Sequence, residues 1–371
     1  PYTNEIIYQD FAPLTYDSGN YLPALEKAVE LIGYDKFLQE EQPRLRAEGR
    51  HVGIGIVTYV EGTGIGPYEG AKVTVESSGR VSVATGIGTQ GQGHFTSFAQ
   101  IVADQLGVDV TNVRLVTGDT SEFYWGAGTF ASRGAVVAGN AIHAAAVAVR
   151  RKILRNASNE LEVDEEDLEI ANGAVQVKGA PHTAIKLGDL ALKANPLRGA
   201  VKPGTEPGLE ATDYFGPERG ATASGVHAMI VEVDPETMQV EIKRYVVVHD
   251  CGRVINPMIL EGQIQGGVAQ GIGNAFYEQL VFDESGQLLN ASFMDYLLPT
   301  AADVPRIETD HVETPSPLNP LGIKGAGEAG AIPVGPLFAQ AIEDALHKQG
   351  LEILDIPLSP SKLYDLVNRL P

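Results

Sequence analysis

Apolar side chains recur every three or four residues in several stretches of the chain, and this period predicts amphipathic helices. Gly33 and Gly107 directly follow two of these stretches, as is typical of helix C-termini. A further, charged stretch over residues 39–50 is also expected to be helical. The five periodic stretches cover residues 21–32, 94–106, 134–155, 260–279 and 336–349.

Other segments alternate apolar and polar side chains, which predicts strands. Asn172-Gly173 lies between two of them and favours a tight hairpin turn. Val231 and Val233 flank Glu232, so that strand is expected to have one face toward solvent. The predicted strands cover residues 52–59, 71–77, 80–85, 112–116, 168–171, 174–177, 226–233 and 240–249.

Polar and proline-containing stretches separate these elements. We expect an extended arm over residues 1–20 and long irregular segments over 118–133, 178–222 and 299–321. Strands and helices do not alternate strictly and no repeat has a fixed period, so the predicted class is α+β, with mixed sheets and segregated helices. The predicted domains are an arm with linking helices (1–50) and two α+β units (51–222 and 223–371).

Charge and cysteine content exclude several classes of function. The 48 Asp and Glu against 27 Lys and Arg give a net charge of −21, which argues against nucleic acid as a partner. The single cysteine, Cys251, cannot form an internal disulfide or a cysteine-rich metal site, and we expect it to be a small buried residue. No apolar run is long enough to predict a membrane span, and an unpaired cysteine fits a cytoplasmic location. The first residue is Pro1, with no signal peptide after it, so we expect a processed or partial chain.

Glycine is in excess, with 42 of 371 residues, about 11 % against a usual ~7 %. Residues 86–91 fit the pattern G-x-G-x-x-G between a strand and a helix, which is the context of a dinucleotide-binding turn. The matching acidic residue, Asp119, lies 119 − 91 = 28 residues beyond Gly91, where about 20 is usual. One alternative is therefore an NAD-dependent dehydrogenase, which requires a parallel sheet of about six strands after residue 86. The other is a tight strand-to-helix turn with no ligand.

Glycine-rich loops recur at helix starts, at residues 86–93, 126–134, 262–273 and 322–330. Bare backbone N–H groups at helix N-termini bind phosphate, and Gln side chains both donate and accept hydrogen bonds to a heterocycle. We therefore expect these four loops to converge on one polar, phosphate-bearing ligand.

At these loops the sequence resembles the large, molybdenum-binding subunit of the xanthine dehydrogenase family, the molybdenum hydroxylases. In motif style it is most similar to carbon monoxide dehydrogenase-type large subunits. The resemblance rests on ordered blocks that span nearly the whole chain: Gly-Thr-Gln-Gly-Gln-Gly-His (88–94), Ala-Ser-Arg (131–133), the Asp-Cys-Gly to Gln-Gly-Ile-Gly region (250–273) and Lys-Gly-Ala-Gly-Glu-Ala-Gly (324–330).

The resemblance implies a molybdopterin fold and a molybdenum–molybdopterin cofactor, expected in its cytosine dinucleotide form, with no metal ligand from a side chain. It implies hydroxylation of an aldehyde, N-heterocycle or similar electron-poor carbon, with water as the oxygen source and Glu328 as the general base. Gln263 and Glu328 are expected near the metal. The implied cofactor-binding residues are Gln90, Gly91, Gln92, Gly93, His94, Ser132, Arg133, Gly134, Gln263 and Gly327.

The resemblance also implies partners. The chain corresponds to the C-terminal half of the family's large subunit, so we expect activity only with the N-terminal half, an iron–sulfur subunit carrying 2Fe–2S clusters and an FAD subunit, in a dimer of hetero-oligomers. A non-catalytic pterin-binding scaffold is the remaining alternative. Tyr59 and Glu61 are secondary candidates for a substrate channel.

Overall fold

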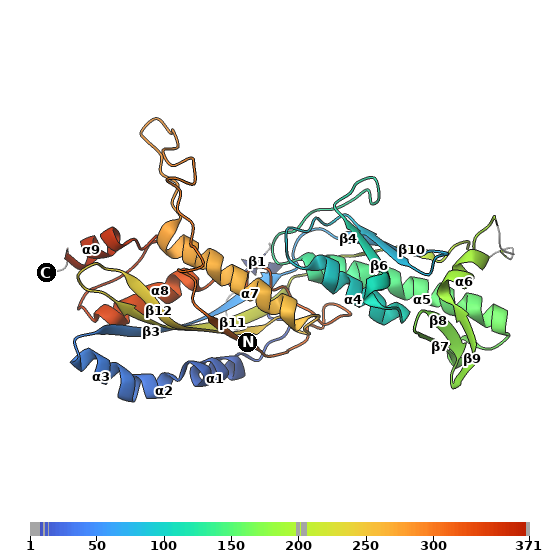
Figure 1. Cartoon of the computed structure of the whole chain (residues 1–371), viewed down its shortest axis with the longest axis horizontal. Coiled ribbons are helices and arrows are strands. Elements are labelled where there is room, and N and C mark those ends of the chain that lie inside the picture. The colour runs from blue at the N-terminus through green and yellow to red at the C-terminus, as the bar shows by residue number, and fades with distance from the viewer. Residues whose placement is uncertain (1–7, 10–11, 14, 198–200, 202–205, 369–371) are drawn as a thin grey trace.

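Two four-stranded sheets lie end to end and give the molecule its elongated shape (Figure 1). The computed structural model describes residues 8–9, 12–13, 15–197, 201 and 206–368. We call the part built on the sheet that contains β11 the β11 lobe, and the part built on the sheet that contains β5 the β5 lobe; each name is that of an inner strand of the sheet. A short antiparallel pair, β1 (Tyr8–Gln9) and β2 (Ala12–Pro13), lies near the N-terminus; most of the predicted arm falls outside the described residues.

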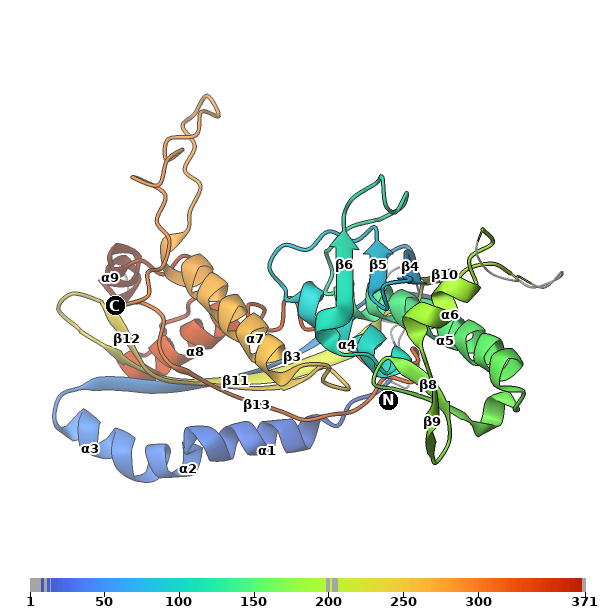
Figure 2. The same ribbon diagram turned by 45° about the vertical axis from the view of Figure 1, so that its right-hand side comes forward.

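The sheet of the β11 lobe has the order β13–β12–β11–β3. Its pairs are antiparallel except β12 with β13, which is parallel. Helices cover both faces, with α1 to α3 on one side and α7 and α8 on the other (Figure 2). The strands are β3 (His51–Thr63), β11 (Ala221–Val233), β12 (Val240–Asp250) and β13 (Ile307–His311); the helices are α1 (Tyr21–Ile32), α2 (Tyr34–Lys36), α3 (Gln42–Ala47), α7 (Pro257–Ile272), α8 (Val334–Leu346) and α9 (Pro360–Asn368).

The predicted alternation holds at the end of β11, where Glu232 is partly exposed between buried Val231 and Val233, but the rest of the strand is buried on both faces, so a solvent-facing side along the whole strand is wrong. Ile230 packs in the cluster under α1, while Val231 packs in the cluster under α8. Glycine in β3 allows α8 to pack closely against this strand, because a Cβ at Gly53 would lie 2.2 Å from the carbonyl oxygen of Ala341. Helix α8 therefore rests directly on the backbone of β3.

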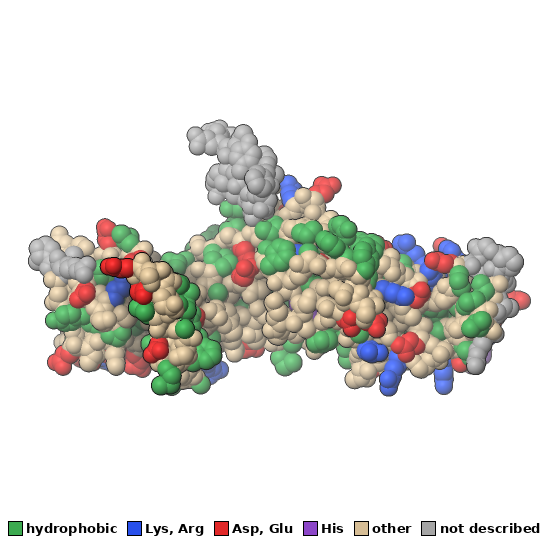
Figure 3. All heavy atoms as spheres, turned by 90° about the horizontal axis from the view of Figure 1, so that it is seen from above, with side chains coloured by type: hydrophobic (Ala, Val, Ile, Leu, Met, Phe, Trp, Pro, Cys, Tyr) green, Lys and Arg blue, Asp and Glu red, His purple; other side chains and the backbone are tan. Residues whose placement is uncertain are grey.

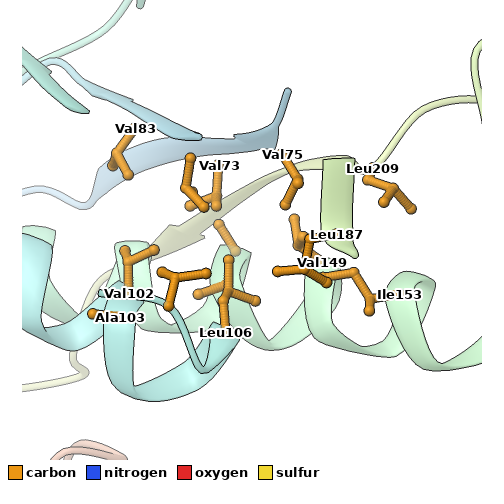
Figure 4. Packing of buried hydrophobic residues seen from close by; sticks show 14 of the residues in the cluster. Val73, Val75, Val83, Val102, Ala103, Leu106, Val149, Ile153, Leu187 and Leu209 are labelled. Carbon is orange, nitrogen blue, oxygen red and sulfur yellow. The ribbon is translucent and has the colours of Figure 1, made fainter. Parts of the chain in front are cut away.

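The sheet of the β5 lobe has the order β10–β4–β5–β6, and only β5 and β6 are parallel. Helix α5 packs along this sheet, and Figure 4 shows valines of the sheet meeting α4 and α5 in the core. A three-stranded antiparallel sheet lies at the far end (Figure 1). The elements are β4 (Glu69–Val75), β5 (Val81–Thr85), β6 (Val113–Thr117), β7 (Leu168–Ala171), β8 (Ala174–Val177), β9 (Ala180–Lys186), β10 (Glu210–Phe215), α4 (His94–Leu106), α5 (Asn140–Leu161) and α6 (Leu187–Lys193). A π-helical turn, Gly134–Gly139, leads into α5.

These mixed sheets confirm the α+β class and contradict the NAD-dependent dehydrogenase. The segment after residue 86 does form one strand–helix–strand unit, β5–α4–β6, so the local prediction from the glycine pattern is right. However, the described strands form no parallel sheet of six strands, because each lobe contains a single parallel pair. A dinucleotide fold needs further parallel units beside the first.

The predicted boundary at residue 222 does not divide the strands of one sheet from those of the other. Strand β3 pairs along its whole length with β11, so a strand from the predicted 51–222 unit belongs to the β11 lobe. The chain therefore passes from the β11 lobe into the β5 lobe after β3 and returns with β11. The division into domains at residues 50 and 222 stays a prediction.

Several short elements lie where irregular chain was expected. Strands β9 and β10 and helix α6 fall within 178–222, β13 falls in the proline-containing segment 299–321, and α9 follows α8. The predicted helix 260–279 ends earlier, at Ile272, and continues as a π-helical turn over Gly273–Tyr277. The edge strands β10 and β13 are held by pairing with residues far away in sequence, which no local pattern reveals.

A segment over residues 278–300 projects from the end of α7 (Figure 1). Figure 3 looks down on this segment and shows hydrophobic side chains along it. The exposed large hydrophobic residues on it are Leu280, Val281, Phe282, Leu289, Phe293, Met294, Leu297 and Leu298. Among the described helices, none has both the length and the apolar character to cross a bilayer.

Candidate functional site

A cavity of about 300 Å³ opens where the two lobes meet. Two helical segments begin in its wall, at His94 and Gly134, and Asn256, the N-cap residue of α7, also lines it. Its lining brings together segments from both lobes: residues 90–97, 129–135, 251–263 and 323–328. All the predicted site residues line it except Gly91 and Gly93. Three of the glycine-rich loops, distant in sequence, thus converge as expected, but the fourth predicted loop, 262–273, is wrong, because that stretch lies almost entirely within α7 and contributes only Gln263.

Two glycines place α7 against the loop that carries Glu328. A Cβ at Gly330 would lie 2.2 Å from the carbonyl oxygen of Ile264, and a Cβ at Gly267 would lie 2.7 Å from the Gly330 Cα. This contact brings Gln263, one turn earlier on α7, within reach of the loop. The Gln263 side-chain amide donates a hydrogen bond to the Gly327 carbonyl at 2.7 Å.

The exposed Glu328 lies beside a second carboxyl group. Ser132 Oγ is 2.7 Å from Glu328 Oε2 and also 2.7 Å from Glu61 Oε1, and the Glu328 backbone N–H reaches the same Oγ at 3.1 Å. Burial raises the pKa of Glu61 to about 7; the Ser132 hydrogen bond opposes this rise and the Glu328 carboxyl adds to it. Glu61, only a secondary candidate from the sequence, is therefore part of the site.

The backbone that carries Ser132 is strained. Ala131 and Ser132 both have φ of 48°, a left-handed conformation that costs energy for residues other than glycine. The loop is held from two sides, since the Gly64 N–H donates to the Ala131 carbonyl and a Cβ at Gly325 would lie 2.1 Å from the Ser132 carbonyl oxygen. Strained residues of this kind are common at binding sites.

The Arg133 guanidinium does not face the cavity as a free cation. It is fully buried, pairs with the buried Glu69, and donates to the carbonyls of Ile65, Pro67 and Gly128. Arg133 therefore fastens two loops together, and its contribution to the cavity wall comes from its backbone.

His94 and the two predicted glutamines shape the loop before α4. Burial lowers the pKa of His94 to about 4, so the ring is neutral, and it packs so tightly on Gly134 that a Cβ there would lie 2.7 Å from Nε2. Gln92 accepts a hydrogen bond from the Gln90 backbone N–H and donates one to the Gln90 side chain. Both glutamines line the cavity.

A buried ion pair supports the cavity floor. Lys324 Nζ lies 3.2 Å from Asp250 Oδ2 and donates to Thr314 Oγ1 at 2.9 Å. Cys251 follows Asp250 in sequence, and its carbonyl accepts a hydrogen bond from the Lys324 backbone N–H at 2.7 Å. Burial raises the pKa of the Cys251 thiol to about 12, so the cysteine is a small buried residue and not a reactive thiolate.

These residues fit an organic, phosphate-bearing cofactor that brings its own metal ligands. Helix starts at His94 and Gly134 offer backbone N–H groups and a positive dipole end to an anion, whereas α7 begins at Pro257, which has no N–H, and its Ile259 N–H is bonded to Asn256. The described part of the chain holds no cluster of His, Cys, Asp and Glu side chains suited to bind a metal ion by itself. The volume is at the small end of the range of small-molecule sites.

Comparisons with known proteins agree with this arrangement. Residues 27–305 match the molybdopterin cofactor-binding domain. The chain is 37 % identical, over 94 % of its length, to the nicotine 6-hydroxylase large subunit of Paenarthrobacter nicotinovorans, and 37 % identical, over 98 %, to the carbon monoxide dehydrogenase large chain of Hydrogenophaga pseudoflava. The crystal structure of quinoline 2-oxidoreductase from Pseudomonas putida 86 superposes with a TM-score of 0.89 at 37 % identity, covering 97 % of this chain and 47 % of that one.

The chain therefore belongs to the molybdopterin cofactor-binding family, within the molybdenum-binding large subunits of the xanthine dehydrogenase type. It spans about half the length of these curated relatives, 44 % of the nicotine hydroxylase subunit and 46 % of the carbon monoxide dehydrogenase chain.

Proposed function

We propose that this chain is the molybdopterin-binding half of a molybdenum hydroxylase large subunit, with Glu328 as the general base. The observation that carries the proposal is the convergence of separate loops on one cavity with the Glu328 carboxyl in its wall. Relatives named for nicotine, carbon monoxide and 6-hydroxypseudooxynicotine support the same class of chemistry.

In this proposal the loops at 90–94 and 132–134 hold the cofactor through backbone N–H groups and the Gln90 and Gln92 amides. When bound, the cofactor supplies a metal that activates water and accepts two electrons. Glu328 removes the proton from the attacking oxygen, and Gln263, fixed by its bond to the Gly327 carbonyl, offers its remaining amide groups to the ligand.

The substrate class is an aldehyde, an N-heterocycle or a similar electron-poor carbon, and the cofactor form is the cytosine dinucleotide. The partners are the N-terminal half of the large subunit, an iron–sulfur subunit with 2Fe–2S clusters and an FAD subunit. Subunit names such as "large subunit" and "complex subunit gamma" among the relatives support a hetero-oligomer.

The test is Glu328→Gln in the complex that contains this chain. The amide has the shape of the carboxylate but cannot take a proton, so kcat should fall by about 10²–10⁴. Molybdenum and released cytidine monophosphate should stay at the wild-type ratio, because the cofactor contacts come from other residues. Glu261→Gln, an exposed change on α7 outside the cavity lining, serves as the matched control.

Unchanged activity in the Glu328→Gln complex would refute the assigned base. A wild-type complex that carries molybdenum and nucleotide but turns over no oxidisable substrate would favour the non-catalytic scaffold instead.

A further inference from the structure

The contacts around Ser132 Oγ require one proton more than the serine supplies. A hydroxyl group has one proton to donate and two lone pairs that accept. The Glu328 backbone N–H uses one lone pair, and both carboxyl oxygens, of Glu61 and Glu328, lie 2.7 Å from the same Oγ. The serine proton can go to only one of them, so the other carboxyl must be protonated and donate to the second lone pair.

No cation offsets the two acids. Neither Glu61 nor Glu328 forms an ion pair with a Lys or Arg among the described residues. Of the cations in the cavity lining, Arg133 pairs with the buried Glu69 and Lys324 with the buried Asp250. The exposed Arg253 forms no ion pair with either acid among the described residues.

The remaining groups around Glu61 do not supply a charge either. On the same strand, burial keeps the pKa of Tyr59 well above its usual value, so the phenol is neutral, and it bonds to His249. Burial also lowers the pKa of His249 to about 4. The second carboxyl oxygen of Glu61 is buried without a hydrogen-bond partner. An unpaired full charge there is costly, whereas a protonated carboxyl is not.

We propose that Glu61 is a positioning residue that holds one proton shared through Ser132 with Glu328, so that the pair carries a single negative charge located on the Glu328 side, in the cavity wall. The chain of donors then runs from the Glu61 carboxyl to Ser132 Oγ and from Ser132 O–H to the Glu328 carboxylate. The strained left-handed backbone at Ser132 is what puts the hydroxyl between the two acids.

This inference rests on the proposed role of Glu328 as a base, and it places the single negative charge of the pair at that base. The hydrogen bond from Ser132 stabilises the carboxylate, and the proton on Glu61 removes the repulsion of a second charge. When Glu61 loses its proton at higher pH, the pair gains a second negative charge, and the Glu61 carboxyl can no longer donate a hydrogen bond to Ser132. The pair titrates as a unit, and burial, which raises the pKa of Glu61 to about 7, places the loss of the shared proton near that pH.

The experiment is an infrared titration of the cofactor-loaded complex between about pH 5 and about pH 9, following the stretching band of protonated carboxyl groups. The difference between wild type and Glu61→Gln should contain one such band that disappears with a midpoint near 7. Because the amide introduced by this substitution still donates to Ser132, the variant should keep its cofactor. The wild-type kcat/KM profile should contain a step near pH 7, and the variant should lose it. Glu241→Gln, an exposed change on β12, should retain both the band and the step.

Ser132→Ala gives the second arm. In the proposed arrangement Ser132 Oγ accepts the Glu61 proton and so favours the protonated acid, which means that removing the hydroxyl should move the midpoint to lower pH. A band that persists in Glu61→Gln, or a midpoint that does not move in Ser132→Ala, overturns the shared proton. The infrared result does not depend on turnover. If Glu328→Gln were fully active, the proposed base would fail while the protonation of Glu61 would still be decided.

Discussion

The buried pair of Arg133 and Glu69 offers the sharpest test of what holds the cavity wall. In Arg133→Met the cation is replaced by an apolar side chain of comparable length, and Glu69 is left charged at a position with 0 % exposed side-chain area. Breaking a buried ion pair on one side costs about 3–5 kcal/mol, which is a large part of a typical total of about 5–15 kcal/mol. The carbonyls of Ile65, Pro67 and Gly128 lose their donor as well.

Removing both charges should cost much less. In Arg133→Met with Glu69→Leu no charge remains buried, so most of the loss should be recovered, apart from the hydrogen bond that Glu69 accepts from the Ala127 N–H. Urea unfolding followed by the fluorescence of Trp125, the single tryptophan of the chain, measures both variants next to this site.

Two results would contradict this reasoning. If the free energy of unfolding of the single variant, Arg133→Met, lay within about 0.5 kcal/mol of the wild-type value, the ion pair would contribute little to stability. A double variant as unstable as the single one would mean that the loss comes from packing. If Arg133 were instead a cofactor ligand, cofactor content would fall with no change in the stability of the protein without cofactor.

Two further predictions concern the packing around the site. Gly330→Ala places a Cβ 2.2 Å from the carbonyl oxygen of Ile264, so α7 must move away from the loop and the molybdenum content, measured by metal analysis, should fall. Gly262→Ala is the control: no atom lies within 4 Å of its Cβ, so it should leave the molybdenum content unchanged. Burial lowers the pKa of His227 to about 3 and of His249 to about 4, so the unfolded state binds protons first as pH falls below about 6.5. Stability should therefore drop between about pH 6.5 and about pH 4, by roughly 1.4 kcal/mol per pH unit for each histidine; a flat melting temperature across that range would refute it.

Much of the fold follows from local sequence. The helices at residues 21–32 and 94–106 begin and end where the apolar period and the following glycine predict, because period and left-handed cap are properties of neighbouring residues. The hairpin at 168–177 has the predicted bounds because Asn172 and Gly173 both take the positive φ that its turn requires. The recurring glycine loops likewise predicted that separate segments would meet.

Other features depend on distant contacts. The glycine pattern at 86–91 predicted a strand–helix–strand unit correctly, but whether more parallel strands join it is decided by pairing across the sheet. Strands β10 and β13 are edge strands whose partners lie far away in sequence. Nothing in the residue types at Ala131 and Ser132 indicates a left-handed backbone, since glycine is the residue expected there.

The sequence by itself determined the amphipathic elements, the turn glycines, the family blocks and Glu328 as the candidate base, because each is encoded in neighbouring residues or in ordered motifs. Tertiary structure alone decided that Glu61 and Glu328 share Ser132, across separations of 71 and 196 residues from the serine, and that Arg133 is an internal anchor. The physical reason is that hydrogen bonding and charge burial depend on distances in space, which only the packing of β3, the 128–134 loop and the 322–330 loop against one another fixes.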